Sequence, residues 1–165
     1  MIFVKPIATT VILSFLLTVF AAATIQSRDI LIVRGKRIYT YEMPGLEKAF
    51  PDQKVPKFNV ISTANYKGYN ATWAVMGGQL YLVGLEALVR EEGKMLWDEK
   101  VLKGLTFPVK VEQWSGEVKR SNSVSVYDPN TNEMKKFVEQ TTIVFKQGKV
   151  IRAEFDKRVP VKKLE

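Results

Sequence analysis

The sequence predicts a mainly β fold, either an antiparallel meander sheet or a partly open barrel, with one or two short helices. Three observations support this prediction. Apolar and polar residues alternate in many short runs, tight turns separate most of these runs, and only one or two segments have a helical pattern. Strands joined by tight turns pair antiparallel, because parallel neighbours need a long crossover between them.

The N-terminus has the pattern of a secretory signal peptide. Lys5 is the only charged residue before Arg28, the run 7–20 is mostly apolar, and three alanines end at Ala23. A basic start, an apolar run and small residues at a cleavage point are typical of such a signal. We therefore predict cleavage after Ala23 and a single β-rich domain, residues 24–165, that is periplasmic or secreted.

The alternative is an uncleaved anchor. Residues 6–27 contain no charge, and about 20 apolar residues suffice to cross a bilayer. If residues 1–23 stay attached, the chain is anchored in the inner membrane with its domain facing the periplasm. This is the only membrane-spanning segment that the sequence predicts.

The chain contains no cysteine and no histidine. This excludes thiol nucleophiles, thiolate metal sites and disulfides, and it removes the commonest general base and transition-metal ligand. A cysteine-free exported chain suits a bacterial periplasm better than a disulfide-rich extracellular scaffold. We therefore expect no enzyme activity, no catalytic residues and no cofactor.

The formal charge is +8, or +7 once Lys5 is removed with the leader. A positive balance favours acidic partners, among them an anionic surface. The charges are dispersed, however, and no stacking aromatic residues are interleaved with the basic pairs near the C-terminus. We therefore do not expect nucleic-acid binding.

The first elements of the domain are predicted from turn residues. Asp29–Val33 and residues 37–43 alternate in polarity around Gly35 and predict a hairpin. Residues 45–50 predict one short helical turn, which ends at Pro51, and a polar connector runs from there to residue 57.

Residues 59–88 form the centre of the predicted fold. Two apolar runs flank Gly77-Gly78, and such a pair is a strong hairpin signal because both residues tolerate positive φ. In an extended chain one face of the first run carries four apolar side chains, which we expect in the core: Tyr69, Ala71, Trp73 and Val75.

The second half begins with residues 89–103, which are rich in charge and predict one helix or a helical excursion that stops at Gly104. Residues 109–114 predict a half-buried strand. Residues 117–126 alternate but are very polar, which is typical of a strand at a sheet edge.

The last predicted hairpin turns at Gln147-Gly148. Its strands are residues 134–146 and 149–155, and both alternate in polarity. From Lys157 onward the chain has little to bury, so we expect the tail to fray.

The densest polar cluster in the apolar centre lies at residues 62–69. Its polar and aromatic side chains, together with Trp114 beside a turn, are our candidates for a small-ligand site at the mouth of a barrel. The alternative is structural, because Asn and Gly near a strand start usually satisfy the backbone or supply a bulge. The candidate ligand-binding residues are Asn65, Tyr66, Lys67, Tyr69 and Trp114.

This segment resembles an uncharacterised bacterial family. The resemblance rests on Ser-Thr-Ala-Asn-x-x-Gly-Tyr-x-Ala-x-Trp at residues 62–73 and on the Leu-Tyr-Leu strand at residues 80–82. It departs from the family at Tyr66 and Lys67, where Trp and Arg are expected. It covers residues 29–85 and, more loosely, Trp-Ser-Gly at 114–116, and it implies a shared β-rich fold, no known activity and no site residues.

A weak calcium pattern occurs in residues 128–139. Asp128, Asn130, Asn132 and Glu139 stand at positions 1, 3, 5 and 12 of a calcium loop, but Glu133 replaces the required glycine. The flanking residues predict strands instead of helices, and the composition is common in hairpin loops. We keep calcium binding only as an alternative.

Three functions follow from these observations. The first is an exported, non-enzymatic binding protein that contacts another envelope protein, for example as an inhibitor or an immunity-like factor. The second is a small-ligand carrier with a β-barrel pocket. The third is a carboxylate-dependent hydrolase, which would need two titratable groups converging in one cleft; neighbouring acids such as Glu91 and Glu92 do not supply this.

Overall fold

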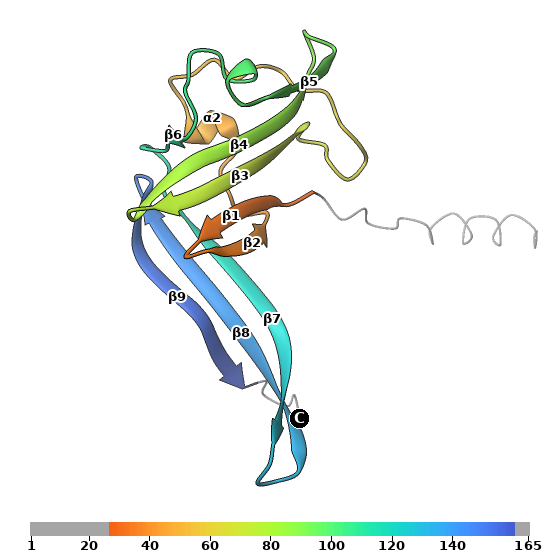
Figure 1. The fold of residues 1–165 in the computed structure, drawn as a ribbon, viewed down its shortest axis with the longest axis vertical. Coiled ribbons are helices and arrows are strands. Elements are labelled where there is room, and N and C mark those ends of the chain that lie inside the picture. The colour runs from red at the N-terminus through yellow and green to blue at the C-terminus, as the bar shows by residue number, and fades with distance from the viewer. Residues whose placement is uncertain (1–26, 161–165) are drawn as a thin grey trace, which may run out of the picture.

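A computed structural model describes residues 27–160, and these are mostly β-sheet, as predicted (Figure 1). The predicted leader, residues 1–23, lies outside the described residues. Two short helical elements occur, α2 (Leu46–Ala49) and the 3-10 turn η1 (Asp98–Lys100). The strands are β1 (Asp29–Val33), β2 (Lys36–Thr40), β3 (Tyr69–Met76), β4 (Gln79–Val89), β5 (Lys94–Trp97), β6 (Val109–Lys110), β7 (Gly116–Asp128), β8 (Glu133–Lys146) and β9 (Lys149–Pro160).

The strands form one sheet in the order β2-β1-β3-β4-β9-β8-β7, with β5 and β6 also paired to β4. Neighbours in this sheet are antiparallel, as predicted, except that β1 and β3 pair parallel. The long connection between β2 and β3, which includes α2, makes this crossover possible.

The two ends of the sheet, β2 and β7, approach each other without forming a ladder. The Lys119 N–H donates to the carboxylate of Glu42, and Arg120 Nη1 donates to the carbonyl oxygen of Arg37 at 3.5 Å. Side chains therefore bridge the seam, and the sheet is a nearly closed, barrel-like structure. Of the two predicted alternatives, this is the partly open barrel.

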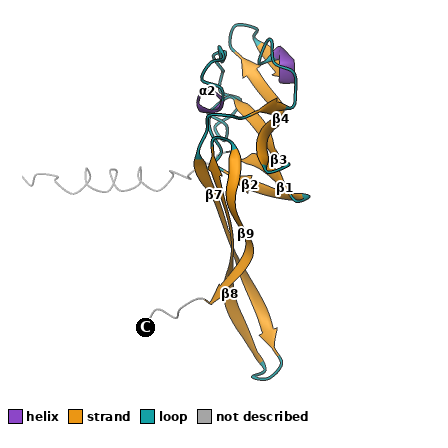
Figure 2. Cartoon of the chain, turned by 90° about the vertical axis from the view of Figure 1, so that its left-hand side faces the viewer, coloured by secondary structure: helices purple, strands orange, loops and turns teal. Residues whose placement is uncertain are grey.

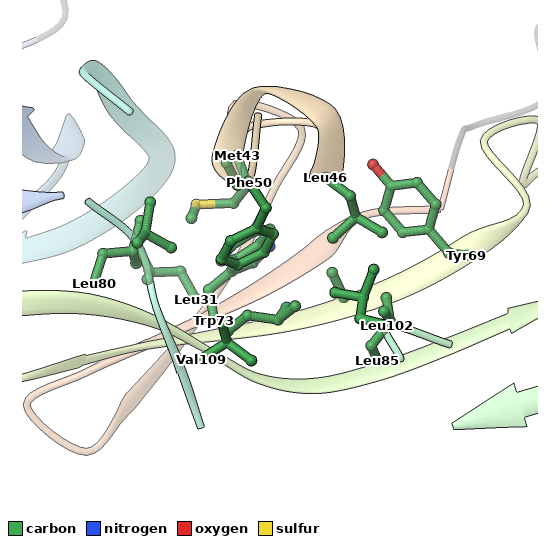
Figure 3. Close-up of a cluster of buried hydrophobic side chains, with 14 of the residues drawn as sticks. Leu31, Met43, Leu46, Phe50, Tyr69, Trp73, Leu80, Leu85, Leu102 and Val109 are labelled. Carbon is green, nitrogen blue, oxygen red and sulfur yellow. The ribbon is translucent and has the colours of Figure 1, made fainter. Parts of the chain in front are cut away.

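The core lies between the sheet and α2 and is centred on Trp73 (Figure 3). Trp73 is fully buried and stacks on Phe50, with ring centroids 6.4 Å apart. Tyr69 and Ala71 are buried on the same face of β3, and Val75 is half-buried. The predicted inward face of this strand is therefore confirmed.

Three hairpin turns were predicted from glycine positions, and all three are present. Arg34-Gly35, Gly77-Gly78 and Gln147-Gly148 each have positive φ at both turn residues. This geometry matches the twist of the flanking strands, which is why such pairs join antiparallel neighbours.

A single helix over residues 89–103 is wrong, and only the short turn η1 within this segment is helical. The chain instead continues β4 to Val89, turns, and returns as β5, which pairs with β4 in antiparallel register. Gly93, at φ 63°, closes this turn through its N–H, which donates to the Val89 carbonyl oxygen at 3.0 Å. The glycine inside the predicted helix is in fact the turn residue.

Two predicted strand boundaries also need correction. The first strand of the central hairpin begins at Tyr69, because residues 59–68 form a loop. The half-buried strand predicted for residues 109–114 is shorter than expected, because only Val109–Lys110 (β6) forms a strand.

The predicted fraying from Lys157 is wrong for residues 157–160, and residues 161–165 lie outside the described residues. Lys157 and Val159 pair with Gln140 and Val138 of β8. The register with β8 shifts between Gln140 and Thr142, where β9 has a bulge with Asp156 at φ 51°. Beyond this bulge β9 continues to pair with β8 through its backbone, although its first two residues there are charged.

Gly148 and Gly35 provide a matched test of packing at hairpin turns. Their φ values are 72° and 74°, so alanine costs the same backbone strain at both, about 1–2 kcal/mol. An added Cβ meets the Val111 carbonyl and the Gln79 side chain at Gly148, but open space at Gly35. We expect Gly148→Ala to lose at least about 1 kcal/mol more unfolding free energy than Gly35→Ala in urea titrations. Equal losses would contradict the packing at this turn.

Candidate functional site

Asn65, the first of the predicted ligand residues, is buried and holds a loop. Its Nδ2 donates to the carbonyl oxygen of Tyr69 at 3.1 Å and to Asn70 Oδ1 at 2.8 Å. Its backbone N–H donates to the Ser62 carbonyl oxygen at 2.9 Å. These bonds fasten the loop of residues 59–68 to the start of β3, which is the structural role left open by the sequence.

Lys67 and Tyr69 lie together over a buried carboxylate, that of Asp29. Asp29, at the start of β1, is 5% exposed, forms an ion pair with Lys67 Nζ, and accepts the Ala71 N–H at 3.3 Å. Lys67 Nζ also lies 4.7 Å from the centroid of the Tyr69 ring. The three side chains fix the loop to the parallel pair of β1 and β3.

Burial raises the pKa of Tyr69 to about 12, and the negative charge of Asp29 adds to this effect. The Leu46 N–H donates to the phenol oxygen and partly offsets it. Tyr69 is therefore a neutral phenol that links β3 to α2, and its ring lies beside Leu46 at the start of that helix (Figure 3).

Tyr66 and Trp114, the other two candidates, lie apart from this buried group. The Tyr66 side chain is 61% exposed. Trp114 packs on Phe145 of β8, with ring centroids 5.2 Å apart, and its ring fills the space that a Cβ on Gly116 would need. The structure thus brings Asn65, Lys67 and Tyr69 together and assigns Trp114 to the packing under β7 and β8.

The calcium alternative does not form one loop. Glu139 lies opposite Asn122, six residues along β8 from Glu133, which corresponds to about 20 Å of strand. Its carboxylate instead accepts Arg158 Nε at 3.0 Å. Asp128 pairs with Lys135 and accepts the Asn130 N–H, as in an ordinary hairpin loop.

Residues 27–160 contain no group of three or more acidic side chains placed to hold a metal ion. The neighbouring acids Asp98 and Glu99 each accept a backbone hydrogen bond: Asp98 Oδ1 accepts the Leu85 N–H at 2.8 Å, and Glu99 Oε1 accepts the Phe107 N–H at 3.4 Å. No helix in this part of the chain is long and apolar enough to cross a membrane.

A carrier would need an enclosed cavity, and the space under the sheet is filled by the core side chains around Trp73. An open groove of about 570 Å³ lies on the opposite face of β1, β3 and β4, lined among others by Ile30, Thr72 and Trp97. None of the five predicted ligand residues lines it.

The most distinctive surface is a long two-stranded projection, which we call the arm (residues 121–140). It comprises the distal half of β7, the turn at residues 129–132 and the distal half of β8. Figures 1 and 2 show it extending well away from the body of the sheet. Only the last residues of β9 run alongside it, so most of its side chains on both faces are exposed or half-buried.

The arm carries apolar cross-strand pairs. At its tip Tyr127 lies opposite Met134, and these side chains are 54% and 59% exposed. Nearer the body Val124 lies opposite Phe137, on the other face of the ribbon. Sequence analysis predicted the edge strand but missed the arm, because alternation alone does not show whether a second layer covers a hairpin.

Fold and surface together define a barrel-like β domain with a projecting β-ribbon. No protein-family model, no curated protein and no solved structure matches this chain. The resemblance of residues 62–73 to an uncharacterised family therefore stays a prediction.

The Asp29–Lys67 pair predicts an asymmetry between its two single substitutions. Lys67→Met leaves a buried carboxylate without its cation and should cost roughly 2–4 kcal/mol of unfolding free energy. Asp29→Asn should cost about half as much, because Lys67, whose side chain is 30% exposed, can turn to water. Urea titrations of both variants measure this order, and the reverse order would contradict it.

Tyr69 predicts a loss of stability at high pH. An unfolded tyrosine ionises near pH 10, whereas the folded phenol keeps its proton to about pH 12. The folded state therefore binds more protons between these values, and stability falls by about 2–3 kcal/mol as the pH rises through them. Tyr69→Phe should reduce this fall in urea titrations at about pH 9 and pH 12, and an equal fall in the variant and the parent chain would contradict the assignment.

Proposed function

We propose that this chain is an exported binding protein of the bacterial envelope, which acts by contact with another envelope protein and not by catalysis. The arm is its contact surface. The observation that supports this most directly is the exposed Tyr127–Met134 pair at the end of the ribbon, beyond the part of β8 that β9 pairs with in the described residues.

The shape of the arm favours recognition. A two-stranded ribbon is at best marginally stable in water, so a long, uncovered one contributes little to the core. Aromatic residues and Met are enriched in the centres of protein interfaces. A narrow projection of this kind also fits a cleft on a partner, which is the geometry that an inhibitor or immunity-like factor requires.

The charges of the arm favour a protein partner over an anionic surface or nucleic acid. Lys135 pairs with Asp128 at the tip, and Arg158 of β9 pairs with Glu139. Because opposite charges are interleaved, the arm lacks the single-sign field that attracts polyanions.

Export is supported by the sequence pattern of residues 1–23. The absence of catalysis is supported by the composition, which lacks His and Cys, and by the backbone hydrogen bonds that Asp98 and Glu99 accept.

The arm is tested by photo-cross-linking in intact cells. A photoreactive amino acid at Met134 should give a specific adduct with a different envelope protein, and one at Ile151 should not. Ile151 is the matched control, because it is 62% exposed but lies on β9 away from the arm. The double change Tyr127→Ser and Met134→Ser should weaken binding of the captured partner roughly tenfold or more. Equal labelling at Met134 and Ile151 would count against the arm as the contact surface.

A further inference from the structure

The outer edge of β7 is unpaired, and one hydrogen bond shows which residues face outward. β7 is the last strand of the sheet and pairs only with β8 among the described strands. The Lys119 N–H donates away from β8, to Glu42. Since N–H and C=O groups of alternate residues point to opposite sides of a strand, Ser121, Ser123, Ser125 and Tyr127 also direct theirs outward.

This edge lacks the usual protection against pairing. Exposed edges are normally interrupted by charges, proline or bulges. Residues 121–127 contain no charged residue and no proline, and the outward positions are three serines and a tyrosine. The β7–β8 register runs without a shift over the whole strand, whereas β8–β9 is shifted twice. The edge is therefore long, open and free of bulges.

We propose that two copies of this chain pair antiparallel along β7, with the two-fold axis at Val124. In this register Ser123 faces Ser125 of the second copy, and Ser121 faces Tyr127, so the outward groups meet outward groups. Arg120 then faces Asp128 at both ends of the contact. The strand is thus complementary to itself in both hydrogen bonding and charge.

Neighbouring registers lose the charge match. The backbone groups that point outward can also meet if one copy slides by two residues along the other. Such a shift places Asp128 opposite Val118 or Asn122 instead of Arg120. In the monomer, Arg120 forms only long hydrogen bonds, to Asn122 at 3.3 Å and to the Arg37 carbonyl at 3.5 Å. Its guanidinium can therefore turn to the Asp128 carboxylate of the second copy at a small cost in free energy.

The groove between β2 and β7 receives the end of the second arm. It has a volume of about 240 Å³ and is lined by Arg28, Tyr39, Lys119 and Arg120, with Glu42 at its side. The turn after Asp128 of the second copy arrives here, where cations outnumber the single acid. The pairing buries about eight backbone hydrogen bonds but little area, so the dimer is weak and is best trapped covalently.

This inference is independent of the proposed function. Dimerisation uses the backbone edge of β7 and the turn after Asp128, whereas the proposed partner contact uses the side chains of Tyr127 and Met134. Failure of one test therefore leaves the other unaffected.

A cysteine introduced into this cysteine-free chain tests the register directly. Across the two-fold axis, Val124 lies in a non-hydrogen-bonded pair with Cα atoms about 4.5 Å apart, within disulfide range. Val126→Cys is the matched control, because its two copies lie about 14 Å apart. Full-length Val124→Cys, oxidised in cells and run on a non-reducing gel, should give roughly ten times more dimer than Val126→Cys.

Charge reversal supplies the second measurement. In the Val124→Cys chain, Arg120→Asp should lower the dimer yield roughly tenfold, because the symmetry places two like-charged pairs at the contact. Adding Asp128→Arg should restore it. Equal cross-linking at Val124→Cys and Val126→Cys, adducts of Val124→Cys with another protein only, or indifference to charge reversal would each overturn the proposed pairing.

Discussion

The shape of the sheet depends on which strands pair with the two edges of β4. A strand has two edges, and one edge of β4 is occupied by β3 along most of its length. The other edge is divided among three short contacts, with β9 at Gln79, β6 at Tyr81 and Leu82, and β5 from Glu86 to Val89. Because β9 touches β4 at one residue only, the sheet of β7, β8 and β9 diverges from the body and its distal part leaves the core.

Because of this divergence, the molecule has two parts that are stabilised by different interactions. Around Trp73 the sheet and α2 enclose a close-packed core, and truncation there costs several kcal/mol in general. In the arm, most side chains are exposed or half-buried and only residues 137–140 have β9 beside them, so stability comes mainly from backbone pairing and the apolar surface stays exposed. The exposed faces and the open edge of the arm do not pack against the core. They therefore remain available for binding.

The fold was predictable wherever local chemistry decides structure. Hairpins at Gly35, at Gly77-Gly78 and at Gly148 follow from residues that tolerate positive φ. Residues 89–103 were misassigned because charged residues suit both a helix surface and a solvated hairpin, and only pairing with β4 selects the hairpin. For the candidate site, Asn65, Lys67 and Tyr69 are close in sequence and lie together. Their partner Asp29 was not predictable, because it is distant in sequence and the parallel pairing of β1 with β3 brings it there.

The sequence by itself determined the predominance of strands, the positions of the tight turns, the inward face of β3 and the edge character of β7, since each depends on neighbouring residues. It also excluded thiol and imidazole chemistry through composition alone. Only the tertiary structure decided which strands pair, that β1 and β3 run parallel, that a buried Asp29 meets Lys67, and that the arm leaves the body. The physical reason is that alternation specifies one face of a strand but neither its partner nor what covers the other face.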